Sequence, residues 1–425
     1  MIGIVFAAVL CRGAALRLEG GRAWLKAEGT PVSKVLQLFE QRGAEVLIDP
    51  SLELGRVDGE WEDTDVDRLI GQLVSPHSYS IQWKLVESPL GGFYQVSSIR
   101  VFGDTAAAVK RISSPERVLD VVVGADGTKY IRGEILVGFK TGSTVNDLNA
   151  LLRLLNGTVI EVIDPPGIYR IKLNDGLAVE EAVKTASAFP MVDAADANRA
   201  FSSAGAPPVA LSGTNSGIHL GLVPGGTAIA VFDSGLDPAY AGMDFISGTY
   251  NALNPGAAID DPTGHGTLVS LIAAGAVTPE GETAGSSSAS VLSVKVFDEN
   301  GMTSSDILMS MVNYAVESDI GVINLSFGTY EDVGFLENSV QYAASQGITI
   351  FVASGNDGLD TAVNPAASSA TVSVGAANPD GSIADYSNTQ ADTFSSGTVY
   401  FGGSTYYGTS FASPYTAYLY ATGSQ

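Results

Sequence analysis

Three short segments carry residue types that together could hydrolyse an amide bond. Residues 231–235 contain Asp233, residues 264–267 contain His265, and residues 408–414 (Gly-Thr-Ser-Phe-Ala-Ser-Pro) contain Ser410. A serine hydroxyl is a weak nucleophile at its own pKa, so a neutral imidazole must take its proton during attack on a carbonyl. A carboxylate on the other ring nitrogen fixes the tautomer and stabilises the imidazolium. We therefore predict that Asp233, His265 and Ser410 form a catalytic triad.

The local pattern around each of these residues indicates how it is positioned. Residues 227–232 form a continuous apolar run, typical of a central parallel strand, and the aspartate follows at its carboxyl end, where open α/β sheets place their sites. The histidine begins a helical pattern, and the serine lies at a turn that enters the last helix. His77 and His219 are the only other histidines, and neither has a comparable context.

The second half of the chain alternates between strand-like and helix-like patterns. Apolar runs at 227–232, 291–297, 321–326 and 348–353 are separated by helical patterns at 265–275, 304–318 and 334–346. Alternation with crossovers of this length implies a parallel sheet covered by helices on both faces. The predicted fold class is therefore α/β, with a doubly wound parallel sheet.

At these motifs the chain resembles the subtilisin-like serine proteases, or subtilases, over about half its length, and we assign residues 214–425 to the catalytic domain. The resemblance implies that Asn356, in Ser-Gly-Asn-Asp-Gly, donates its amide to the oxyanion together with the Ser410 backbone N–H. It also implies that Ser326, Phe327 and Gly328 bind an extended substrate by added-strand hydrogen bonding. The chain departs from the family after Pro414, where Tyr415 and Tyr418 replace the usual residues and the last helix is short.

Residues 23–101 are expected to form a small α+β domain. Apolar residues spaced as on one helix face predict two helices, the second with Thr64 as N-cap: Val32, Val35, Leu36 and Phe39, then Val66, Leu69, Ile70 and Leu73. This region resembles the short N-terminal domain of secretins and TonB-dependent receptors, which implies docking to an envelope protein. Residues 102–130 are predicted to be a linker with one strand.

Residues 131–200 have the order βαββαβ, which predicts a second small domain with a ferredoxin-like fold. It resembles a subtilase propeptide, which implies an inhibitor and intramolecular chaperone; an unrelated ferredoxin-like module is the alternative. Residues 201–213 are rich in Ser, Ala, Gly and Pro and are expected to be a cleavable linker. We hypothesise self-cleavage within residues 199–214.

Residues 1–15 have the pattern of a secretory signal peptide. An apolar stretch from Ile2 to Leu10 is too short for a bilayer and ends before small residues near Ala15. A buried N-terminal strand is the alternative. Cys11 is the only cysteine, so a chain without the signal would contain no disulfide and no thiol nucleophile. These features predict a secreted or periplasmic protein without a membrane span.

The net charge of −24 is distributed unevenly. Beyond Arg199 there is one cation, Lys295, against twenty Asp and Glu. Such a surface repels nucleic acid and anionic lipid, so we expect neither as a partner. Solubility, protection from trypsin-like enzymes and tolerance of salt or calcium are three open interpretations. We expect no metal site and no required cofactor, with Ca²⁺ left open.

Together these patterns predict an exported, self-processing serine endopeptidase that acts on proteins or peptides. The alternative is a catalytically silent interaction protein with a subtilase fold, which docks an envelope partner through its N-terminal domain.

Overall fold

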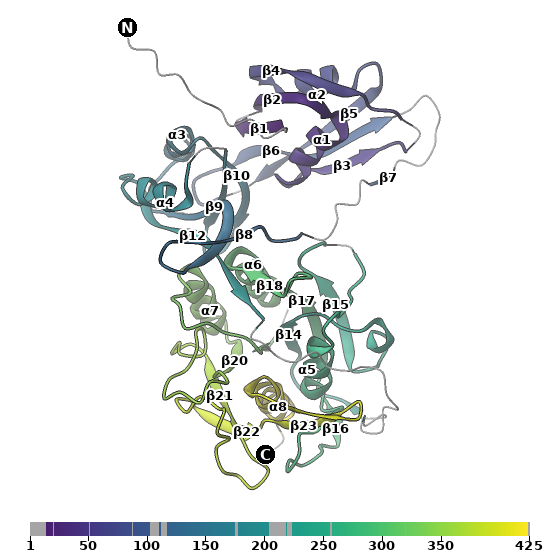
Figure 1. Ribbon diagram of the computed structural model, residues 1–425, viewed down its shortest axis with the longest axis vertical. Helices are drawn as coiled ribbons and strands as arrows, with labels where there is room; N and C mark the ends of the chain where they lie inside the picture. Colours follow the sequence, from purple (N-terminus) through teal and green to yellow (C-terminus); the bar gives the residue numbers. More distant parts are fainter. Residues whose placement is uncertain are drawn as a thin grey trace. The chain divides into compact units, whose positions relative to one another are not determined.

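The computed structural model describes residues 14–19, 21–50, 52–86, 88–102, 110–111, 117–174, 177–203, 218, 223–255, 257–318 and 320–423. The chain divides into two compact units (Figure 1): Met1–Ser114 with Gly133–Ala197, and Pro115–Arg132 with Asn198–Gln425. Most of the predicted signal peptide (residues 1–15) and of the predicted cleavable linker (201–213) lies outside the described residues. Both therefore stay predictions.

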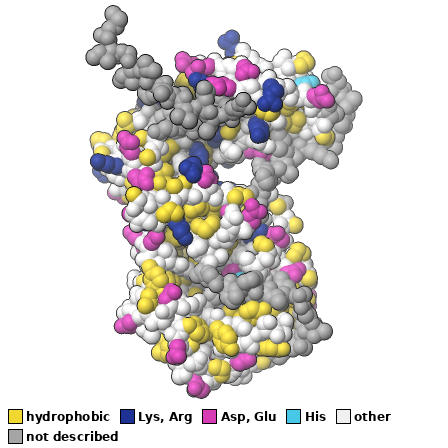
Figure 2. All heavy atoms as spheres, viewed as in Figure 1, with side chains coloured by type: hydrophobic (Ala, Val, Ile, Leu, Met, Phe, Trp, Pro, Cys, Tyr) yellow, Lys and Arg dark blue, Asp and Glu magenta, His cyan; other side chains and the backbone are white. Residues whose placement is uncertain are grey.

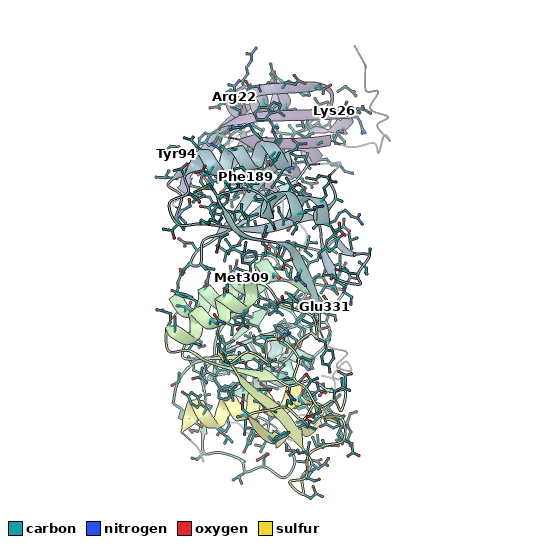
Figure 3. All side chains as sticks on the ribbon, turned by 90° about the vertical axis from the view of Figure 1, so that its left-hand side faces the viewer. Arg22, Lys26, Tyr94, Phe189, Met309 and Glu331 are labelled. Carbon is teal, nitrogen blue, oxygen red and sulfur yellow. The ribbon has the colours of Figure 1, made fainter. Side chains whose placement is uncertain are left out.

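The first unit begins with a small module of two sheets and two helices. One antiparallel sheet has the order β1-β2-β4 and consists of β1 (Ala14–Glu19), β2 (Arg22–Pro31) and β4 (Arg56–Asp65). The other has the order β5-β6-β3-β7 and consists of β3 (Glu45–Ile48), β5 (Ser78–Val86), β6 (Phe93–Phe102) and β7 (Lys110–Arg111). The helices α1 (Val32–Glu40) and α2 (Val66–Val74) bury their apolar faces in one common core. Figure 3 labels Arg22 and Lys26 on β2.

Both helices of this module were predicted from their spacing, and all eight of the expected apolar positions are buried. The predicted cap of the second helix was wrong. Asp65, not Thr64, is the N-cap of α2, and its carboxylate accepts a hydrogen bond from the N–H of Asp67 at 3.0 Å. Thr64 remains in β4, because that strand continues up to the helix. β1 lies before the predicted start of the domain at residue 23, and its Leu16 is buried in the core.

The rest of the first unit has the predicted ferredoxin-like fold. Its elements follow the order β9-α3-β10-β11-α4-β12, and its strands lie in the order β10-β11-β9-β12. Their bounds are β9 (Lys129–Phe139), α3 (Val145–Leu155), β10 (Gly157–Ile163), β11 (Ile168–Leu173), α4 (Val179–Ser187) and β12 (Val192–Ser202). Both ends of this fold extend into the second unit, where β8 (Val121–Val123) pairs with the start of β9.

The second unit is built on a seven-stranded parallel sheet, which confirms the predicted doubly wound α/β fold. The strand order is β15-β17-β14-β19-β20-β21-β22, and every neighbouring pair is parallel. The bounds are β14 (Ile229–Asp233), β15 (Ile246–Asn251), β17 (Val291–Lys295), β19 (Val322–Leu325), β20 (Thr349–Ala353), β21 (Val372–Ala377) and β22 (Thr393–Ser396). The four central strands were predicted, whereas β15, β21 and β22 were not.

Helices cover both faces of this sheet (Figure 1). On one face α5 (His265–Ala273) packs against α8 (Thr409–Thr422), and on the other α6 (Ser305–Glu317) packs against α7 (Phe335–Ser345). Met309, labelled in Figure 3, is buried on α6. The smaller elements are β13 (Val223–Pro224) with β16 (Ser287–Ser288), η1 (Pro238–Tyr240), β18 (Met302–Ser304), and the hairpin β23 (Thr398–Phe401) with β24 (Ser404–Tyr407).

The last helix, α8, is 14 residues long, so it is not short beside the other helices of the described residues, and it is held by the tyrosines that depart from the family pattern. Tyr418 is 1% exposed, and its hydroxyl donates to the backbone oxygen of Ser287 at 2.9 Å. The ring lies against two glycines: a Cβ placed on Gly275 would be 2.4 Å from the ring, and one on Gly285 would be 1.7 Å from the hydroxyl oxygen. Tyr415 also donates to the backbone, at Thr283 O. The ring of Tyr418 thus occupies space that side chains at Gly275 and Gly285 would otherwise fill.

This packing predicts that Gly285→Ala lowers the free energy of unfolding by about 1–3 kcal/mol, as overpacking of a filled core does. Chemical denaturation in a Ser410→Ala background measures it. Gly225→Ala is the matched control, since a Cβ on Gly225 meets nothing within 4 Å. Tyr418→Phe removes the hydroxyl oxygen, which is the atom nearest to the new methyl group. The double variant Gly285→Ala/Tyr418→Phe should therefore lose less free energy of unfolding than the sum of the losses in the two single variants. Strict additivity would contradict this account.

Candidate active site

Asp233 and His265 are in direct contact. Asp233 is the last residue of β14, His265 is the first residue of α5, and the Nδ1 atom of the histidine lies 2.8 Å from Oδ1 of the aspartate. Both side chains are buried, at 4% and 8% exposed. The same Oδ1 also accepts from the backbone N–H of Ser234 at 2.8 Å. The backbone of Ser234 therefore helps to hold the Asp233 carboxylate in the position from which it contacts the imidazole.

Two glycines allow α5 to approach the turn after β14 closely enough for this contact. A Cβ on Gly266 would lie 2.5 Å from the backbone oxygen of Gly235 and 3.1 Å from the nitrogen of Ser234. Gly235 has φ of +123°, and a Cβ there would lie 1.9 Å from the oxygen of Asp260. A side chain on Gly266 would push the helix away from this turn, and one on Gly235 would collide with the loop that leads into the helix.

Asp261 organises the same region and was missed in the sequence. Its two carboxylate oxygens accept hydrogen bonds from Ser234 Oγ at 2.8 Å, Gly264 N at 2.9 Å, and Thr267 N and Oγ1 at 2.8 and 2.7 Å. It thereby links the turn after β14 to the first turn of α5. In the sequence, the role of Asp261 is indicated only by its position four residues before His265. Aspartates are common in loops, so this position alone does not predict a role.

These carboxylates shift the pKa of His265. Burial lowers the pKa, but the negative charge of Asp233, its hydrogen bond to the ring and the charge of Asp261 together outweigh burial. The pKa is therefore raised above its ordinary value of 6.5. The two carboxylates therefore stabilise the protonated form of the ring, which a catalytic base adopts transiently during turnover.

Ser410 lies in the first turn of α8, which a polar network attaches to β19. Ser410 Oγ donates to the backbone oxygen of Ser326 at 3.2 Å, and Ser326 Oγ donates to the backbone oxygen of Ser410 at 3.0 Å. From within the strand, Asn324 donates to Ser326 Oγ at 3.0 Å and accepts from Ser413 Oγ at 2.8 Å. Asn324 is completely buried and is a second positioning residue that the sequence did not reveal.

The serine hydroxyl donates to Ser326 O and is not bonded to the histidine. Nε2 of His265 is buried and has no hydrogen-bond partner among the described residues. The ring centroids of His265 and Phe411, the residue after Ser410, are 5.6 Å apart. A rotation of the serine side chain away from Ser326 O is therefore needed before its proton can reach Nε2.

Asn356 follows β20 and faces the start of α8. Its Oδ1 atom accepts from both the backbone N–H and the hydroxyl of Thr409, at 2.8 and 2.9 Å. The amide nitrogen then points towards Gly408, where an ideal Cβ would lie 3.6 Å from Asn356 Nδ2 and 3.7 Å from Ser410 N. Both predicted oxyanion donors thus border one space, which the missing side chain of Gly408 leaves open.

The predicted substrate-binding residues lie in two different surroundings. Ser326 and Phe327 line a small pocket of about 20 Å³ together with Asp233 and His265. Phe327 contacts Phe297 edge to face, with ring centroids 5.2 Å apart. Gly328 does not line this pocket; a Cβ there would lie 2.2 Å from the side chain of Val363.

The last strand of the ferredoxin-like fold leads to the same pocket. Residues 200–202 of β12 pair antiparallel with Met302–Ser304 of β18, and Ser203 N donates to Gly301 O at 2.8 Å. Ser203 is also one of the residues that line the pocket. The chain's own backbone therefore pairs with β18, and the next residue, Ser203, borders the pocket that Asp233 and His265 line.

The chain is similar to known proteins. The profile of the Subtilase family matches residues 225–423, and that of the fervidolysin N-terminal prodomain matches residues 116–198. The thermophilic serine proteinase of Bacillus sp. (strain AK1) is 30% identical over 307 residues, which cover 67% of this chain and 73% of that protein. This chain belongs to the subtilase family. It is a subtilisin-like serine endopeptidase with a prodomain.

Two further likenesses support the assignment over shorter spans. The minor extracellular protease Epr of Bacillus subtilis (strain 168) is 33% identical over 205 residues, 48% of this chain and 30% of that protein. The crystal structure of fervidolysin from Fervidobacterium pennivorans, a keratinolytic enzyme related to subtilisin, covers 73% of this chain and 57% of its own, with a TM-score of 0.53. At 18% identity that likeness supports the fold alone. The catalytically silent alternative finds no support in these comparisons.

Two searches of the described residues bear on other kinds of site. In this part of the chain no helix is both long and apolar enough to cross a membrane. The same residues contain no group of three or more His, Cys, Asp and Glu side chains arranged to hold a metal ion.

The raised pKa of His265 predicts how this subtilase depends on pH. The base must be neutral, so kcat/KM should fall as pH drops through a value above 6.5. Asp261→Asn removes one of the charges that raise this pKa, so the acid limb should move to lower pH. Asp244→Asn, at an exposed carboxylate that does not contribute to the shift, is the control. An acid limb that stays in place or moves upward in Asp261→Asn would contradict the assignment.

Proposed function

We propose that this subtilase is an exported, self-processing endopeptidase whose triad is Asp233, His265 and Ser410. The observation that carries the proposal is the buried contact between Asp233 and His265 Nδ1, which leaves Nε2 bare next to the start of α8. A hydrogen bond at Nδ1 selects the tautomer with an unprotonated Nε2, and this is the atom that a serine needs as its base.

In the first half of the reaction, Ser410 Oγ gives its proton to His265 Nε2 and attacks the carbonyl carbon of the substrate. The C–N bond then breaks as the imidazolium returns that proton to the leaving amine, and an acyl-serine remains. In the second half a water gives its proton to Nε2, attacks the acyl carbon, and Ser410 recovers its proton as the acid leaves. Asp233 stays ionised throughout and stabilises the imidazolium in both halves.

The negative charge that forms on the carbonyl oxygen has two proposed donors, Asn356 Nδ2 and the backbone N–H of Ser410. Their common border at Gly408 and the two bonds from Thr409 that orient the amide support this role. A preorganised donor of this kind lowers the activation barrier by about 3–4 kcal/mol. Substrate backbone would pair with the edge strand β18 and with Ser326 and Phe327, which favours recognition of extended peptides over a particular side chain.

Self-processing is supported by the path of the chain's own backbone. Residues 200–202 already lie on β18 as a substrate strand would, and Ser203 reaches the pocket that contains Asp233 and His265. Cleavage shortly after Ser203 would separate the prodomain from the catalytic domain. This position falls within the range 199–214 that the linker composition indicated.

The roles of the outer segments stay proposals. We propose that residues 1–15 direct export and that the module formed by β1 to β7 docks a protein of the cell envelope. No cofactor enters the mechanism above, and a stabilising Ca²⁺ remains an open question that unfolding with and without a chelator would answer.

The purified full chain should cut itself after Ser203 within residues 204–214, and Ser410→Ala should stay intact. Removing the nucleophile is expected to lower turnover by about 10⁶-fold, the loss known for subtilisin itself. Mass spectrometry of the fragments and labelling with a fluorophosphonate probe measure both effects. Ser404→Ala, at an exposed serine in the β24 turn, is the control and should process and label normally. A Ser410→Ala chain that is still cut in isolation would refute the proposal.

A further inference from the structure

A cavity of about 150 Å³ lies inside the first unit, and none of the described residues around it belongs to the candidate active site. Five apolar side chains, each at most 9% exposed, contribute to its wall: Phe39 on α1, Val96 on β6, Leu148 and Leu152 on α3, and Val159 on β10. The first two belong to the module formed by β1 to β7, and the other three belong to the ferredoxin-like fold. The cavity is therefore an apolar space that both parts of one compact unit line.

One face of the ribbon formed by β5 and β6 connects this cavity to the surface. Trp83 pairs with Val96 across the two strands, and both line the cavity. Leu85 pairs with Tyr94 two residues further along each strand, so all four side chains lie on the same face. Tyr94, labelled in Figure 3, also lines the cavity and is 66% exposed. The first unit carries both acidic and basic side chains on the face in Figure 2, whereas an apolar ligand can reach the cavity along these uncharged residues.

Three of the polar side chains at the cavity wall already have hydrogen-bond partners within the protein. Gln95 Nε2 donates to the backbone oxygen of Arg42 at 3.0 Å, and Thr158 Oγ1 accepts from the N–H of Leu18 at 3.3 Å. Arg42 itself donates from Nη1 to the backbone oxygen of Leu38 at 2.9 Å. A ligand is therefore not needed to satisfy these groups, and the wall favours a ligand without polar atoms.

The charge at the wall restricts the ligand further. Arg42 carries a permanent positive charge at 8% exposure, and the described residues at the wall include no Asp or Glu. A cationic ligand would be repelled by Arg42 and would lose its hydration in an apolar space without a carboxylate to pair with. An anionic ligand would have to compete with Leu38 O for the guanidinium and would also lose its hydration. The wall therefore favours a neutral ligand.

An apolar cavity of this volume accommodates a molecule of the size of benzene. We propose that the cavity binds a small, neutral hydrophobic molecule no larger than a single aromatic ring with short substituents. The bound molecule contacts Val96 on one side and Leu148 on the other, so it buries apolar surface of both parts of the first unit and stabilises their association. This inference does not depend on the proposed protease activity.

Benzene is the probe, and calorimetric titration of the full Ser410→Ala chain, which cannot cut itself, measures its affinity. The parent chain should bind benzene saturably. Asn149→Phe adds a ring at a half-buried position of the wall on α3, so the affinity should fall by about tenfold or more as the space is filled. Asn146→Phe is the matched control, because it makes the same change at an exposed position of α3 away from the wall. An absence of saturable binding to the parent, an unchanged affinity in Asn149→Phe, or an equal loss in Asn146→Phe would overturn the proposal.

Leu148→Ala tests the opposite change and keeps the proposal testable if Asn149→Phe does not fold. It removes a buried side chain from the wall, so the enlarged cavity should bind naphthalene about tenfold more tightly than the parent chain does. Leu154→Ala removes a leucine of the same helix that is 58% exposed and does not line the cavity, and it should leave naphthalene binding unchanged. Equal naphthalene affinity in Leu148→Ala and the parent chain would contradict the assignment of this wall.

A series of n-alkylbenzenes tests the predicted size of the ligand. The affinity should stop rising once the alkyl chain is longer than the cavity can hold. An affinity that still rises through hexylbenzene and is lost in Leu85→Ser would show that an extended chain binds along β5 and β6, and this result would overturn the proposed ligand class.

Hydrogen exchange tests whether the ligand links the two parts of the first unit. In the Ser410→Ala chain, saturating benzene should slow exchange in residues 93–96 of β6 and in residues 145–155 of α3, and Asn149→Phe should abolish both effects. Slower exchange in only one of the two segments would show that the molecule does not bridge them, and it would overturn that part of the proposal. Both readouts are independent of self-cleavage.

Discussion

The arrangement of this protease domain depends on one buried contact, the hydrogen bond from His265 to Asp233. An ionised carboxylate with little exposure is costly unless it is paired and fully hydrogen-bonded. Here the backbone of Ser234 and the imidazole satisfy it, and Asp261 bonds the surrounding loop. That requires the first turn of α5 to lie directly on the end of β14, which in turn requires Gly235 and Gly266. The strand order, the position of α5 and the two glycines thus all contribute to the contact between His265 Nδ1 and Asp233 Oδ1.

The serine arrives from the other end of the chain and is fixed independently. α8 is tied to β19 by Asn324, Ser326 and Ser413 and is packed by Tyr418 against glycines. This division explains how the last helix positions Ser410: its first turn is held by hydrogen bonds and its later turns by aromatic packing. In the observed arrangement the Ser410 hydroxyl donates to Ser326 O, so the proposed triad requires the serine side chain to turn away from that oxygen.

The sequence was most informative where a period or a motif exists. The apolar runs predicted the four central strands, and helical spacing predicted α1 and α2 with their buried faces. It failed for β4, whose ten residues are mostly charged or polar and exposed, so no alternation was visible. It also failed for Asp261 and Asn324, because hydrogen-bond networks among loop and strand residues have no spacing that a single sequence displays. The same applies to the ion pair between Arg117 Nη1 and Asp306 Oδ2, which are 2.6 Å apart although the two residues are far apart in the chain.

The most direct test of the central claim is a titration of the histidine ring nitrogens by ¹⁵N NMR in the Ser410→Ala chain. Only His77, His219 and His265 contribute signals, and single replacements of the first two assign the third. We predict that neutral His265 carries its proton on Nδ1, has a bare Nε2, and titrates above 6.5. A proton on Nε2 in the neutral form, or a midpoint below 6.5, would contradict the account.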